Sequence, residues 1–197
     1  MIQSAPLALA FILATLFSLL LLVGAREGRS TYLSDTEAHA THVLMNGVMA
    51  VMFAPFYSMD LESWLLAALG LGVVILLIRL AVGLHGKRGS APGTVYHLFA
   101  AAAMIGAILM VPHHSAMEAM AIPAHPPGWP AMLLGAIFAL DAVITAIMAF
   151  AFPRRLIAMA AEIGAGDAGS APASVRILQL SALPHVAMDI GMVLMLV

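Results

Sequence analysis

Long apolar runs alternate with short polar or proline-containing connections along the whole chain. The runs cover residues 6–24, 35–57, 61–84, 94–111, 129–152 and 174–197. Each run is close to the roughly 20 apolar residues that a helix needs to cross the hydrocarbon core of a bilayer. The pattern predicts an all-α, polytopic membrane protein whose six transmembrane helices form a single domain, residues 1–197.

Local signals indicate where several of these helices begin and end. Ser34 and Glu37, in S-D-T-E, have the spacing of a capping box, so we expect the second helix to begin there. Pro112 and Pro153 follow the fourth and fifth runs and should stop those helices. Pro184 falls inside the sixth run, where we expect a kink. The first run lacks a basic leader and a cleavage signal, which is typical of a retained span.

The basic residues predict the orientation of the chain. All eight fall on one side of the six-span topology: Arg26, Arg29, Arg79, Lys87, Arg88, Arg154, Arg155 and Arg176. The positive-inside rule makes this side cytoplasmic, so both termini should lie outside the cytoplasm. Trp64 and Trp129 would then belong to the aromatic belt at the outer interface. We expect the protein in the plasma (inner) membrane of a bacterium.

Composition supports a membrane protein and narrows its chemistry. Hydrophobic residues make up 63% of the chain and charged residues 9%, and the mean hydropathy is +1.05. The connections leave no room for a separate soluble domain. No basic run is present, so nucleic acid is not an expected partner. Because there is no cysteine, thiolate metal sites, disulfides and thiol catalysis are excluded.

Two distant segments share one pattern of histidine and methionine. HVLMNGVMAVM, residues 42–52, and HVAMDIGMVLM, residues 185–195, both read His-Val-x-Met-x-x-x-Met-x-x-Met. HLFAAAAMIGA, residues 97–107, is a thinner copy that keeps the histidine and one methionine. The three segments would run in the same direction through the membrane. We therefore expect three helical hairpins, 1–57, 61–112 and 129–197, each ending in a His/Met helix, with a binding site at the interface of the repeats.

This pattern predicts a copper site, because imidazole and thioether ligands without thiolate suit Cu(I). On a helix the repeated offsets fall on one stripe, which would provide a path for uptake, transfer or storage of the ion. Buried histidines in a span are functional candidates by default, whereas the methionines could equally fill gaps in the core. The metal candidates are His42, His97, His185, Met45, Met49, Met52, Met104, Met188, Met192 and Met195.

Three of the other polar residues inside the predicted spans are candidates for a supporting role. Asn46 and Asp189 follow His42 and His185 by one helical turn, where they could orient the imidazoles, and Asp141 lies in the middle of the fifth span. Hydrogen bonding between helices is the alternative role for these residues and for the histidines, and a proton relay is another.

The connection between the fourth and fifth spans holds a second group of candidate ligands. His113, His114, Met117, Met120 and His125 lie close together in it, with His-x-x-Met-x-x-Met spacing from His114. They predict an outer acquisition site, with a solvated polar loop as the alternative.

The segment HVLMNGVMAVMFAP, residues 42–55, resembles the His/Met signature of small multi-pass actinobacterial membrane proteins classified as a domain of unknown function. The similarity covers most of the chain and implies no established activity. The Met-x-x-x-Met pairs, Met45/Met49 and Met188/Met192, also look like the motif of copper transporters that conduct Cu(I) through a Met-lined pore. That family has three spans in each subunit, so the likeness extends to the motif alone.

Other functions remain open at this level. Paired histidines could hold haem, a copper site with an open position could serve a membrane oxidase subunit, and the polar residues could belong to a structural or assembly subunit of a complex. No substrate-binding motif is recognisable, so the pattern favours a binding or transport protein over an enzyme. The expected partners are the lipid bilayer and a metal ion, with a second copy of the chain or another membrane subunit as further candidates.

Overall fold

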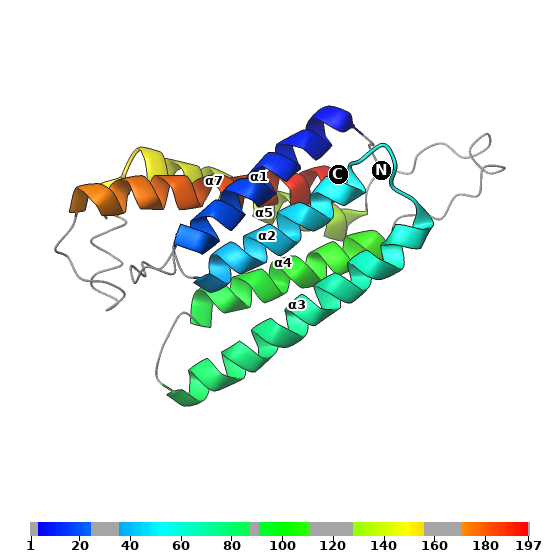
Figure 1. Cartoon of the computed structure of the whole chain (residues 1–197), viewed down its shortest axis with the longest axis horizontal. Coiled ribbons are helices and arrows are strands. Elements are labelled where there is room, and N and C mark those ends of the chain that lie inside the picture. The colour runs from blue at the N-terminus through cyan, green and yellow to red at the C-terminus, as the bar shows by residue number, and fades with distance from the viewer. Residues whose placement is uncertain (1–3, 25–35, 87–90, 111–127, 156–170, 197) are drawn as a thin grey trace.

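The computed structural model describes residues 4–24, 36–86, 91–110, 128–155 and 171–196. Six long helices make up most of these residues (Figure 1). No β-strand occurs among these residues. The fold is therefore all-helical, as the apolar runs predict. The helices are α1 Ala5–Gly24, α2 Thr36–Met52, α3 Met59–Gly86, α4 Ala91–Met110, α5 Trp129–Phe150 and α7 Ala171–Leu196.

Four of the helices contain stretches that are long and apolar enough to cross a membrane. These stretches are Ala5–Val23, Asp60–Val82, Trp129–Phe150 and Leu178–Leu196. Two shorter apolar stretches, Ala38–Phe53 and Gly93–Leu109, correspond to α2 and α4. The helices indicate a membrane-embedded protein in contact with lipid.

The helix ends differ from the sequence prediction in one instructive place. Helix α2 ends at Met52, earlier than the predicted end at residue 57. Phe53 still donates to the Met49 carbonyl, but Ala54 donates to Val51 in a tighter turn. The residue before a proline is disfavoured in helical conformation, and Pro55 follows at once. The predicted capping box involves Ser34, which lies outside the described residues.

The six helices pack mainly as neighbours in sequence. The most extensive contacts join α1 with α2, α3 with α4, and α5 with α7, while α7 also contacts α1 and α2. Figure 1 shows that α2, α4 and α7 run in one direction and that α1, α3 and α5 run in the other. The three helices with the histidine segments are therefore parallel, and their corresponding residues can lie at similar heights.

Apolar side chains cover most of the outside of this bundle, and several histidine, aspartate and asparagine side chains are buried within it. Helices α1 and α5 expose most of their leucine, isoleucine and valine side chains, and α3 exposes nearly half of those described. Helix α7 is more enclosed, since 44% of its apolar stretch is buried against 17% for α1 and α3. The buried interior contains histidine, aspartate and methionine, together with the stacked pair Phe11 and Phe53, whose ring centroids are 5.3 Å apart. This arrangement suits a bundle surrounded by lipid.

Candidate metal centre

Three histidines from three different helices meet in the bundle interior. His42 of α2, His97 of α4 and His185 of α7 are 1%, 6% and 8% exposed. Their ring centroids are separated by 5.1 Å for His42 and His97, 5.3 Å for His42 and His185, and 6.2 Å for His97 and His185. These are the residues that begin the three related segments of the sequence.

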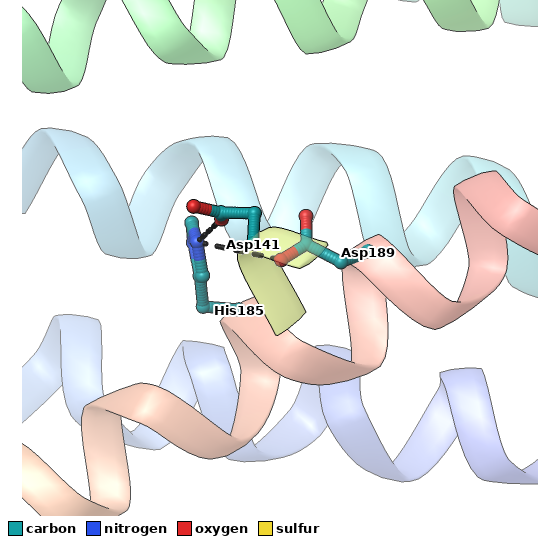
Figure 2. A group of neighbouring side chains, drawn as sticks. All are labelled: Asp141, His185 and Asp189. Carbon is teal, nitrogen blue, oxygen red and sulfur yellow. Dashed lines mark hydrogen bonds and ion pairs between the residues drawn. The ribbon is translucent and has the colours of Figure 1, made fainter. Parts of the chain in front are cut away.

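His185 occupies the centre of this cluster and uses both ring nitrogens. Its Nδ1 lies 3.1 Å from Nε2 of His42. Its Nε2 lies 2.9 Å from Oδ2 of Asp141 on α5 and 3.5 Å from Oδ2 of Asp189 on α7. Figure 2 shows the imidazole facing both carboxylates, which approach from two helices. The cluster thus connects α2, α5 and α7 through one side chain.

The two contacts of His185 define a consistent hydrogen-bond chain. When Nε2 of His185 carries the proton, it donates to Asp141, and Nδ1 then accepts from the Nε2–H of His42. In this arrangement Nδ1 of His42 keeps a free lone pair, and that atom is buried without a hydrogen-bond partner. Nδ1 of His97 is also buried without a hydrogen-bond partner. Buried ring nitrogens without a hydrogen-bond partner are uncommon, and a neutral imidazole can coordinate an ion through its unprotonated nitrogen.

Tyr96 completes the cluster, and the sequence reasoning did not identify it. Its hydroxyl donates to Oδ1 of Asp189 at 2.6 Å, and its ring centroid lies 5.2 Å from that of His185. Asp189 is fully buried, and its second oxygen, Oδ2, has no hydrogen-bond partner. Tyr96 therefore holds one carboxylate oxygen and leaves the other facing His185. The available sequence signal was a tyrosine directly before His97 in an otherwise apolar run.

Local helix geometry explains how the sequence places these groups. His185 and Asp189 are four residues apart, so they share one face of α7. Asn46 stands at the same offset from His42, where the sequence suggested that it orients an imidazole. Its amide instead donates to the carbonyl of Pro184 at 3.2 Å, which joins α2 to α7 next to the histidine. Helix α7 continues across Pro184.

The described residues include one group with suitable geometry for a metal ion. Asp141, His185 and Asp189 each offer a ligand atom, and these atoms lie within 4.8 Å of one another. From the sequence, the two aspartates were expected to orient the histidines. In the structure Asp141 is 2.9 Å and Asp189 3.5 Å from His185, against 3.1 Å for His42, so an ion could take N and O ligands from this side of the ring as well.

The methionines lie in the core of the bundle. Met45, Met49, Met52, Met104, Met188 and Met192 are 0% exposed, and Met195 is partly buried. Met49 has a visible packing role: its sulfur lies against Gly191 of α7, at a point where a Cβ atom would collide with it. The thioether stripe therefore also forms helix contacts.

The outer group of candidate ligands lies between α4 and α5 in the sequence. His113, His114, Met117, Met120 and His125 are outside the described residues. The acquisition site there stays a prediction.

Comparison with known proteins assigns the chain to a family. It belongs to the family described as a domain of unknown function (DUF5134), which matches residues 34–197. No curated protein and no solved structure matches the chain. The family carries no assigned activity, so a function has to be argued from the cluster itself.

Proposed function

We propose that this membrane protein binds a transition-metal ion inside its helix bundle and that the ion is copper. The observation that carries the proposal is the meeting of His42, His97 and His185, from three helices, beside two buried or half-buried carboxylates. Burying this many ionisable groups within apolar helices is costly, and such groups usually mark a functional site.

The distances around His185 support an ion shared by this residue with His42 or with Asp141. Metal–nitrogen bonds of about 2.0–2.1 Å place two ligand atoms of one ion roughly 3 Å apart. Nε2 of His42 and Nδ1 of His185 are 3.1 Å apart, and Nε2 of His185 is 2.9 Å from Asp141. An ion on either side of His185 would need only small side-chain movements and would replace hydrogen bonds that already orient the rings.

Copper fits the combination of ligands better than other first-row ions do. Imidazole and carboxylate groups suit Cu(II), and thioethers suit Cu(I). The interior supplies both kinds, because buried methionines lie on the same helices as His42, His97 and His185. Zinc would use the nitrogen and oxygen atoms and leave the methionines without a ligand role. We infer uptake, transfer or storage of the ion as the biological task.

The topology of the proposal is six spanning helices in three hairpins. The pairing of α1 with α2, α3 with α4, and α5 with α7 supports the hairpins, and the shorter α2 and α4 would cross the bilayer within them. Arg79 lies near the end of α3, Arg154 and Arg155 follow α5, and Arg176 lies near the start of α7. These helix ends lie at the opposite end of the bundle from the start of α1 and the end of α7 (Figure 1). The positive-inside rule then places the termini outside the cytoplasm, in a bacterial plasma membrane.

A second candidate function is purely structural. The contacts of His42 with His185, of His185 with Asp141, and of Tyr96 with Asp189 already hydrogen-bond four helices together. A subunit that uses these bonds only to fix its bundle would need no metal.

Metal analysis of the purified protein separates the two candidates. Protein from copper-supplemented cells should contain about one copper ion per chain by inductively coupled plasma mass spectrometry. We expect the H42Q/H97Q/H185Q and D141N/D189N variants to lose most of it. D60N/E62Q is the matched control, because its carboxylates lie in the first turn of α3, away from the cluster.

The same samples decide the alternatives. Elution profiles in detergent report whether each variant is folded. Copper-free wild-type protein, or copper retained equally by all variants, would overturn the metal proposal and favour the structural role. A Soret band in the visible spectrum would show that the bound cofactor is haem and not copper.

A further inference from the structure

A groove runs along the seam between α2 and α3, with α4 at its base. Its volume is about 210 Å³. None of the histidines or aspartates of the metal centre lines it. Its walls include Leu44 of α2 and Gly72, Ile75 and Arg79 of α3.

The groove has a buried floor and an exposed rim. Met45, Leu69 and Ala101 form the floor and are 0–4% exposed, whereas Ile75 and Arg79 are exposed at the rim. The rim belongs to the face of α3 that also exposes leucine, isoleucine and valine side chains. In a bilayer this face contacts lipid, so the groove is open to lipid from the side.

Helix packing leaves this seam only partly filled. Helix α3 packs chiefly on α4 and makes far fewer contacts with α2. The two helices touch where Leu44 of α2 packs on Gly72, since a Cβ on Gly72 would collide with the leucine. Apolar side chains form most of the groove wall around this contact, which suits a hydrocarbon chain better than a polar ligand.

The length of the groove suits one acyl chain of a phospholipid, and its charge suits the phosphate. Leu69 and Arg79 are ten residues apart on α3, which corresponds to about 15 Å at 1.5 Å per residue. Arg79 lies three residues before Val82, where the apolar stretch ends. A long basic side chain at this depth reaches the interface, and a guanidinium pairs with phosphate through two hydrogen bonds.

We propose that this groove binds an anionic phospholipid, with one acyl chain along α2 and α3 and the phosphate on Arg79. An anionic lipid is favoured over a zwitterionic one, because the ammonium of a zwitterionic headgroup competes with arginine for the phosphate. Basic pockets between transmembrane helices on the cytoplasmic side commonly select anionic headgroups. The groove shares Met45 with the metal candidates but none of the histidines or aspartates of the metal centre, so the lipid proposal stands whether or not the protein binds copper.

Native mass spectrometry of the full chain in detergent tests the proposal. Phosphatidylglycerol should add as one retained lipid per chain at concentrations where phosphatidylcholine leaves most chains free. We expect R79Q to weaken phosphatidylglycerol binding about tenfold, the order expected for loss of one charge-assisted contact. R176Q is the matched control, because Arg176 is an exposed arginine on α7, outside the groove.

A second variant tests the apolar half of the site. I75W should fill the rim and reduce lipid retention while leaving Arg79 in place. The proposal is overturned if both lipids bind equally, if R79Q and R176Q lose binding to the same extent, or if I75W retains phosphatidylglycerol as the wild type does.

Discussion

Replacing Gly191 by alanine is expected to force α7 away from α1 and α2. A Cβ at this position would collide with the sulfur of Met49 and would lie 2.7 and 2.9 Å from two ring atoms of Phe11. Both neighbours are buried, and the ring of Phe11 is stacked on Phe53. Neither can move without disturbing the core contacts that hold the three helices together.

The expected magnitude follows from two opposing effects. Adding a methyl group to a well-packed core costs about 1–3 kcal/mol. Alanine is also a better helix former than glycine, by about 0.8–1.0 kcal/mol. At Gly106 of α4 nothing lies within 4 Å of a Cβ, so G106A should gain helix propensity without any packing cost. The free energies of unfolding of G191A and G106A should therefore differ by about 1–3 kcal/mol.

The assay is thermal unfolding of each variant in detergent, monitored by circular dichroism. For a protein of this size, each kcal/mol shifts the midpoint temperature by about 2–4 °C. We expect the loss in G191A to be smaller in a Met49→Ala background, since the sulfur no longer occupies the space. Equal stability of G191A and G106A would refute the close packing of Met49 on α7 and would leave that methionine free for a ligand role.

Three further outcomes follow from single contacts. Tyr96→Phe should lower copper affinity about 10–100-fold in a metal-competition titration, because Asp189 loses the donor that orients it; unchanged affinity would remove the carboxylate from the metal site. Gly72→Ala should lower the midpoint temperature, and a second change of Leu44 to alanine should restore part of it, whereas purely additive effects would contradict the contact. Asn46→Ala should cost about 1–2 kcal/mol in the same assay, since it removes a bond to the backbone of α7, and a neutral result would show that this bond contributes nothing to stability.

Much of the fold could be predicted from the sequence because helix formation and membrane insertion depend on local composition. The apolar runs located all six described helices to within a few residues. The main error, the end of α2, came from treating hydrophobicity as continuous through Pro55. The periodicity of the helix also predicted which side chains share a face, such as His185 with Asp189.

The candidate site was only partly predictable, because periodicity places a residue on a face without saying what that face meets. The sequence singled out the three histidines, yet it could not bring them together. It ranked Asp141 behind the histidines, although the carboxylate contacts His185 directly. Tyr96 was missed, since a tyrosine near the end of a span is ordinarily an interfacial residue.

The sequence alone determined that this chain is helical and apolar and that it carries histidines in parallel segments, since these properties depend on neighbours along one helix. The tertiary structure decided which faces meet: His185 with His42 and Asp141, Met49 with Gly191, and the apolar groove between α2 and α3. The order and rotation of helices depend on many small packing contacts between distant residues, and glycine, leucine and methionine set them as much as the polar groups do.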